Sequence, residues 1–208
     1  QEQGVDTLGL VTPTHFTPAI ALALRGARRA GLTVPVVHNG SGVDSDEALA
    51  LLDGLIDVYL PDLQWGRAAE AERYRGAPWS PEVARTALRE MARQVGELRT
   101  GDDGLATGGL IVRHLVLPDD AAGSLELLAW LYDELGPSAL SLLRQYRPMH
   151  RIAGDPRLDR PLADGEYREV VEAARWMGFG PVFVQEPGCE GLGVPNWDRE
   201  AVFDWERG

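Results

Sequence analysis

Polar side chains follow the apolar runs of this sequence at regular intervals. The run "TLGLV" (7–11) gives way to a turn that carries Thr12, Thr14 and His15. Later apolar runs are followed by, or contain, further polar residues: Asn39, Ser41, Asp62, Gln64, Arg113, Gln145, Tyr146 and Arg147. Hydroxyl, amide, carboxylate and guanidinium groups that converge on one place can hold a polar organic ligand through many hydrogen bonds. These residues are therefore the candidate binding set.

The elements that must position this set alternate between strand and helix. Apolar runs at 7–11, 33–37, 56–60, 108–118, 139–143 and 181–185 predict strands, and patterns at 17–31, 44–55, 80–99, 123–136 and 164–179 predict helices. The strands are nearly continuous hydrophobic runs, which is typical of parallel strands covered by helices on at least one face. In such folds, ligands bind at the carboxyl ends of the strands. The sequence thus predicts an α/β fold with the candidate set along one edge.

The histidines suggest a second chemistry. His15, His38, His114 and His150 are the four histidines of the chain, and all lie on these strand-end segments. Imidazoles and a carboxylate on successive strand ends could hold a divalent metal, as in a barrel hydrolase. The competing interpretation is a barrel that holds an organic cofactor, with Asp62 on a ribose. Neighbouring residues of a strand point to opposite faces, so Arg113 and His114 cannot both face one site.

Composition limits the classes of partner. The 208 residues contain 20 Lys and Arg against 32 Asp and Glu, a net charge of −12 that disfavours nucleic acid. Apolar runs are too short to span a membrane, and the amino-terminal residues do not look like a signal peptide. Cys189 is the single cysteine, so an intrachain disulfide is impossible, and a reducing cytoplasm is the expected location.

Six segments, in order, resemble a known family. They are "LVTPTHF", "VPVVHNGSGVDS", "LLDGLIDVYLPDLQW", "RQVGELR", "LIVRHLVLP" and "RQYRPMHR". They resemble the radical S-adenosylmethionine (SAM) proteins related to pyruvate formate-lyase activating enzymes, and more narrowly an uncharacterised branch of them. The resemblance implies an open, TIM-type (β/α)6 barrel. It also implies a [4Fe-4S] cluster on a C-x-x-x-C-x-x-C loop, and SAM that is cleaved to a 5′-deoxyadenosyl radical.

The resemblance also implies roles for the candidate set. The turn with Thr12, Thr14 and His15 would meet the methionine amino group of SAM. The segments "HNGSG" and "PDLQ" would meet its carboxylate and ribose, and "RQYRP" its adenine side. The D-x-K pattern of the family stands here as Asp62-Leu63-Gln64, so a neutral amide replaces a cationic contact.

The cysteine triad of the family is missing from this sequence. We therefore expect a partial barrel over 1–186 that lacks the first strand and the cluster loop, with residues 187–208 packed on it through Trp197 and Trp205. The chain alone would be inactive, and the cluster would belong to a longer parent enzyme that acts on a protein or small-molecule substrate. A degenerate scaffold barrel stays open as an alternative, as does the metal hydrolase. An open edge beside 7–11 would favour a dimer.

Overall fold

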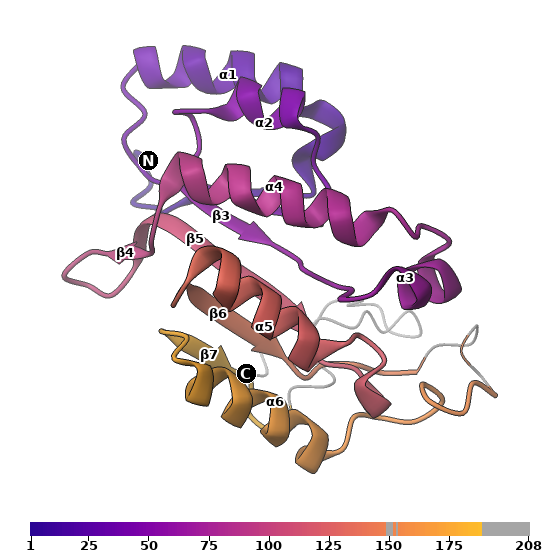
Figure 1. The fold of residues 1–208 in the computed structure, drawn as a ribbon. Coiled ribbons are helices and arrows are strands. Elements are labelled where there is room, and N and C mark those ends of the chain that lie inside the picture. Colours follow the sequence, from indigo (N-terminus) through magenta and orange to yellow (C-terminus); the bar gives the residue numbers. More distant parts are fainter. Residues whose placement is uncertain (149–151, 153, 189–208) are drawn as a thin grey trace, which may run out of the picture.

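The computed structural model describes residues 1–148, 152 and 154–188. A mostly parallel sheet runs through the molecule in the order β1-β2-β3-β5-β6-β7 (Figure 1). Its strands are β1 (Leu8–Val11), β2 (Val36–Gly40), β3 (Val58–Pro61), β5 (Ala106–Leu115), β6 (Ala139–Leu143) and β7 (Val182–Val184). The predicted α/β class and the parallel strands are confirmed.

Helices cover one face of this sheet, as Figure 1 shows. The covering helices are α1 (Thr17–Arg29), α2 (Asp46–Leu52), α4 (Ser80–Val95), α5 (Ser124–Leu135) and α6 (Asp164–Met177). The main core lies between the two layers, where Tyr59 and Leu140 of the sheet meet Leu88, Met91 and Leu128 of the helices. Each of these side chains is fully buried. Burying such side chains is the largest favourable contribution to folding.

No described helix covers the opposite face of the sheet. Along β5, Leu110 and Val112 belong to the helix-side core, whereas Ile111 and Arg113 are only partly buried. At the two ends of the sheet, Val11 is 73% exposed and Phe183 is 46% exposed. We call this side the inner face, because in a closed barrel it would line the interior. A sheet that the helices of the described residues cover on one side agrees with the predicted partial barrel.

Two elements were not predicted from the sequence. Strand β4 (Arg99–Thr100) pairs antiparallel with the start of β5, and α3 (Ala68–Arg75) follows β3. Strand β4 has two residues, too few to show a period, and Ala71 is the one buried residue of α3, which therefore has almost no apolar stripe. The hairpin brings β5 close to the end of α4. At Gly109 (φ +111°) an added Cβ would lie 2.6 Å from the carbonyl carbon of Glu97, so only glycine fits.

One predicted helix start is wrong by a few residues. Asp44 and Glu47 have the spacing of a capping box, but α2 begins at Asp46 and its cap is Ser45. The Ser45 hydroxyl accepts a hydrogen bond from the amide of Ala48 at 3.2 Å. Asp44 is instead buried and accepts a hydrogen bond from the Thr14 hydroxyl. The Asp44 carboxylate therefore holds the turn after β1 and does not cap the helix.

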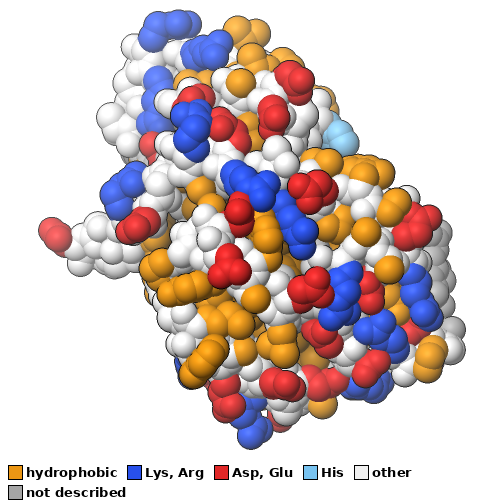
Figure 2. Space-filling view, in the orientation of Figure 1, with side chains coloured by type: hydrophobic (Ala, Val, Ile, Leu, Met, Phe, Trp, Pro, Cys, Tyr) orange, Lys and Arg blue, Asp and Glu red, His pale blue; other side chains and the backbone are white. Residues whose placement is uncertain are grey.

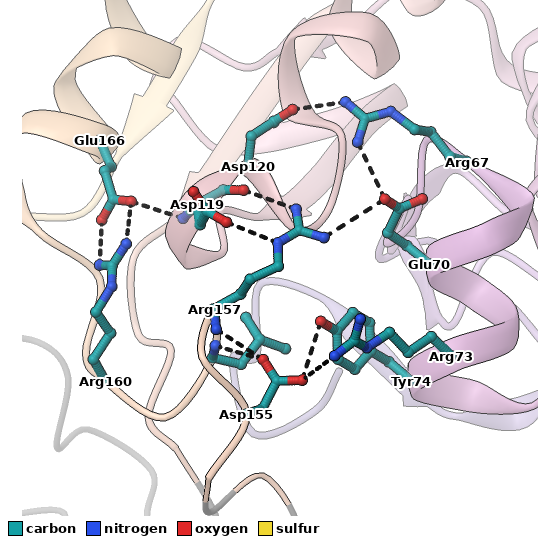
Figure 3. A network of polar contacts seen from close by, with 11 residues as sticks. Arg67, Glu70, Arg73, Tyr74, Asp119, Asp120, Asp155, Arg157, Arg160 and Glu166 are labelled. Atoms are coloured by element: carbon teal, nitrogen blue, oxygen red, sulfur yellow. Dashed lines mark hydrogen bonds and ion pairs between the residues drawn. The ribbon is translucent and has the colours of Figure 1, made fainter.

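A network of ion pairs fastens residues 154–160 to α3 and to the short helix η2 (Pro118–Asp120) after β5 (Figure 3). The Arg157 guanidinium donates to the Asp119 side chain at 2.9 Å and to its backbone carbonyl at 2.8 Å. Asp155 accepts from Arg73 at 2.9 Å, and Arg67 donates to Asp120 at 2.8 Å. Arg67 and Arg73 therefore join segments that are distant in the sequence.

The outer surface mixes charges of both signs. Figure 2 shows acidic and basic side chains interspersed over the face that the helices form, without a large basic patch on that face. None of the helices in the described part of the chain has the length and apolar character that a bilayer crossing requires.

Candidate functional site

Backbone hydrogen bonds tie the carboxyl ends of the strands together one after another. The amide of Thr12 donates to the carbonyl of Asn39 at 2.8 Å, and the amide of Asp62 donates to the carbonyl of Gly40 at 3.0 Å. The next link runs from Leu63 to Arg113 at 2.8 Å. The predicted residues at the ends of β1, β2, β3 and β5 thus lie along one edge of the sheet.

Asp62 and Arg113 form the most specific side-chain contact at this edge. Arg113 Nη2 lies 2.7 Å from Asp62 Oδ1, and the two side chains are 26% and 28% exposed. Both lie on the inner face, in a row that continues from Arg113 to Ser141 and from there to Phe183. Desolvation raises the pKa of Asp62, and the Arg113 guanidinium opposes this rise. The Nε atom of Arg113 is buried without a hydrogen-bond partner among the described residues.

A small cavity extends this site toward the start of α4. Its lining includes three of the predicted residues, Ser41, Asp62 and Gln64, together with Trp65 and Arg75. Gln64 Oε1 accepts a hydrogen bond from Arg75 at 3.0 Å. The indole N–H of Trp65 is buried and has no partner among the described residues, so it can still donate to a ligand or a water molecule. Trp65 and Arg75 were not among the predicted site residues; Arg75 is the last residue of α3 and so lies away from any strand end.

The turn after β1 holds three predicted residues in different ways. Thr12 is exposed and has a left-handed backbone (φ 51°), which few residues other than glycine adopt. Thr14 is fixed by its hydrogen bond to Asp44 at 2.8 Å. His15 is exposed on the short helix η1 (Pro13–Phe16). The turn thus offers one fixed hydroxyl and two free side chains beside the end of β2.

The predicted residues after β6 belong to a second cluster. The Tyr146 hydroxyl donates to the carbonyl of Leu158 at 2.8 Å, and its ring packs on a small core of Leu117, Ala121, Ala122 and Leu158. Gln145 accepts a hydrogen bond from Gln185, and Arg147 is exposed. Contacts within this second cluster, and not Asp62 or Arg113, hold Tyr146 in place.

Two of the four histidines do not face the site, which corrects the argument from their clustering. His38 packs against Tyr59 on the helix side of the sheet, with ring centroids 5.3 Å apart. His114 is also buried on that side, where Nδ1 lies 2.7 Å from the carbonyl of Leu63 and Nε2 lies 2.9 Å from the Ser124 hydroxyl. Both histidines lie near the ends of strands, as predicted, but the alternation of side chains along a strand points both rings away from the inner face.

The metal-hydrolase alternative needs imidazoles that converge. His38 and His114 point into the helix layer from strands that are not neighbours, and His15 is on the exposed turn. His150, Cys189, Trp197 and Trp205 lie outside the described residues. Within the described part of the chain, no group of three or more His, Cys, Asp and Glu side chains could hold a metal ion. The donor geometry gives this alternative no support.

The fold is similar to that of a pyruvate-formate lyase-activating enzyme domain and of a hydrogenase maturase. A solved domain of pyruvate-formate lyase-activating enzyme from Bacteroides vulgatus superimposes with a TM-score of 0.58 at 12% identity, over 86% of this chain and 98% of that one. HydG, a maturase of the [FeFe]-hydrogenase, gives a TM-score of 0.56 at 16% identity, over 88% of this chain and 41% of that one. The predicted resemblance is confirmed at the level of the fold.

Among curated proteins, the chain is similar to the uncharacterized protein MJ0674 of Methanocaldococcus jannaschii. The two are 24% identical over 159 residues, which is 76% of this chain and 43% of that protein. The chain therefore spans less than half the length of the curated relative that it matches. No protein-family model matches the sequence.

Proposed function

We propose that this chain is the SAM-binding barrel portion of a radical SAM enzyme of the activating-enzyme type. The observation that carries the proposal is the Asp62–Arg113 pair at the strand ends of a sheet with this fold. A carboxylate there can accept from both hydroxyls of a ribose, and Arg113 fixes its orientation. Asn39 and Ser41 lie at the neighbouring strand end and supply an amide and a hydroxyl for the amino-acid part of SAM.

The residues present do not fit a [4Fe-4S] cluster. Such a cluster is held by several cysteine thiolates, and the sequence contains one cysteine. We assign no cluster to this chain and propose that a longer parent protein supplies its ligands. In such a protein, the cluster would pass one electron from an external reductant to SAM, which would be the chemistry that it supplies. The residues of this chain would bind and orient SAM and leave the inner face open for a protein or small-molecule substrate. Cytoplasmic location belongs to the same proposal.

Two preparations test the proposal. The first is the longest protein that the gene encodes, purified and reconstituted with iron and sulfide without oxygen. We expect about four irons per protein, and release of 5′-deoxyadenosine from SAM on reduction. The second is the present chain, which should bind SAM weakly in calorimetry and should hold no stoichiometric iron. Absence of cluster, cleavage and SAM binding in both preparations would contradict the proposal and favour a non-catalytic scaffold barrel.

A further inference from the structure

His38 is a buried side chain whose polar atoms are not satisfied. It is fully buried in the helix-side core, and neither ring nitrogen has a hydrogen-bond partner among the described residues. Asp44 is 3% exposed, and its Oδ2 atom also has no hydrogen-bond partner among the described residues. Unpaired buried polar groups cost about 1–3 kcal/mol each, so native proteins normally supply a partner such as an ordered water.

The unpaired atoms of these two residues lie on the same side of Gly40. A Cβ added to Gly40 would lie 3.3 Å from His38 Nδ1 and 3.8 Å from Asp44 Oδ2. It would also lie 2.9 Å from His38 Cε1, closer than ordinary packing permits, so the imidazole packs directly on a position that only glycine fits. The imidazole nitrogen and the carboxylate oxygen can bond to one water molecule, the first as donor and the second as acceptor.

The other oxygen of Asp44 reaches the turn after β1. Thr14 Oγ1 donates to Asp44 Oδ1 at 2.8 Å, although the two residues are 30 positions apart in the sequence. This bond joins η1 to the loop between β2 and α2. Asp44 thus has one oxygen on the side of the turn and the other on the side of His38.

We propose that a buried water molecule links His38 to Asp44, and that this pair positions the Thr12–Phe16 turn through the hydroxyl of Thr14. The inference rests on the proposed function, in which that turn meets the amino group of SAM. His38 and Asp44 are then positioning residues, since neither lies on the inner face. The link connects the packing of the helix layer to the placement of Thr12 and Thr14.

The charged and titratable surroundings of His38 agree with a link to Asp44. Tyr59 packs on the ring from β3, and its hydroxyl donates to Gln94 of α4 at 2.7 Å. Burial raises the pKa of Tyr59, and the carboxylates of Asp44, Asp53 and Glu90 raise it further. Burial lowers the pKa of His38, and the Asp44 carboxylate opposes that shift. Removing the charge of Asp44 should therefore lower the pKa of His38 further.

NMR titration of the histidine Cε1–H signals tests the link in the present chain without SAM. His38→Gln identifies the signal of His38. We expect Asp44→Asn to lower the pKa of His38, while Asp46→Asn, which changes an exposed carboxylate two positions away, leaves it unchanged. An equal pKa of His38 in wild type and Asp44→Asn would overturn the link.

Amide hydrogen exchange tests the positioning. Thr14→Val removes the donor and His38→Leu removes the imidazole, so both should speed exchange in residues 12–16 about five- to tenfold. His38→Gln, which can still bond to the water, should restore most of the protection. Unchanged exchange in Thr14→Val overturns the positioning role. These results do not depend on SAM, so a failure of the proposed function would be seen separately.

Discussion

The guanidinium of Arg113 holds the carboxylate of Asp62 across two neighbouring parallel strand ends, at 2.7 Å, on the uncovered side of the sheet. An ion pair with partial exposure contributes little to stability, commonly ~0–1 kcal/mol. The backbone bond from Leu63 to Arg113 nevertheless keeps the two strand ends side by side, so the two side chains stay within reach of each other. The pair is therefore better suited to recognising a ligand than to stabilising the fold.

Replacing Asp62 separates these two roles. We expect Asp62→Asn to weaken SAM binding at least about tenfold, because an amide accepts fewer hydrogen bonds from a ribose than a carboxylate does. Asp62→Ala should abolish the binding and change the free energy of unfolding by less than about 1 kcal/mol. Calorimetry and urea denaturation measure the two effects, with Asp46→Asn as the control. Unaltered affinity in Asp62→Ala would remove Asp62 from the binding site.

Glu166 should make stability depend on pH. Its hydrogen bonds from Arg160, followed by those from the backbone, lower the pKa of Glu166 from 4.5 to about 2. A carboxyl group whose pKa is lower in the folded state stabilises the fold above its unfolded pKa, and the stabilisation is lost as the pH falls toward the folded value. The difference in unfolding free energy between wild type and Glu166→Gln should therefore be full above pH 4.5 and should vanish near pH 2. A difference that stays the same between pH 2 and pH 7 would contradict the role of Glu166.

Arg157 should contribute to stability, because it attaches residues 154–160 to the rest of the protein. Arg157→Ala removes two hydrogen bonds to Asp119 and the contact with Glu70, so we expect a loss of about 1–2 kcal/mol in unfolding free energy. Because part of this contribution is ionic, the loss should shrink between low and high salt in urea denaturation. Arg168→Ala, an exposed arginine on α6, should cost less than about 0.5 kcal/mol. An equal loss of unfolding free energy in the two variants would show that the network does not stabilise the fold.

Two glycines should respond in opposite ways to one added methyl group. Gly109→Ala forces a side chain against the backbone of Glu97 and Leu98 at a positive φ, so we expect a loss of about 3 kcal/mol or more. Gly26→Ala fills open space within α1 and should gain about 0.5–1 kcal/mol. Thermal and urea unfolding of the purified variants measure both changes. A stable Gly109→Ala protein would contradict the close approach of β5 to the end of α4.

The edge of the sheet should favour self-association. Strand β1 uses the amides of Leu8 and Thr12 to bond toward β2, which leaves those of Gly9 and Val11 on the unpaired side. Val11 is also the most exposed apolar residue of the strand. We expect concentration-dependent dimers in sedimentation velocity, and expect Val11→Lys to abolish them. Leu22→Lys, which changes a similarly exposed apolar residue on α1, should leave the dimers intact. If the unmodified chain stays monomeric at high concentration, the prediction of self-association through β1 is wrong.

The sequence predicts the alternation of strands and helices well because the strands are apolar runs that end in polar residues. The edge that carries Asn39, Asp62 and Arg113 follows directly, since the carboxyl ends of parallel strands share one side. Which face each side chain takes is harder to predict. Apolar residues occupy both faces of β5, so hydrophobicity did not reveal whether Arg113 or His114 faces the helices.

Long-range polar contacts were also not predictable. The Thr14–Asp44 bond and the Arg157–Asp119 bonds join residues that are 30 and 38 positions apart. Asp44 looks like a helix cap from its neighbours alone, and Arg67 looks like part of a solvated helix face. Their partners come from other elements, and local patterns carry no information about such partners.

The turn after β5 has a consequence for the order of folding. Asp119 and Asp120 have consecutive left-handed backbones, with φ values of 55° and 45°, a conformation that costs side-chain-bearing residues about 1–3 kcal/mol each. Asp120 is held by Arg67, but the partners of Asp119 include Arg157 and Glu166, which are synthesised later and lie 38 and 47 positions away. Until residues 154–166 have docked, Asp119 lacks these two partners. The strand ends of β5 and β6 should therefore reach their final arrangement late, after the helix-covered core has formed.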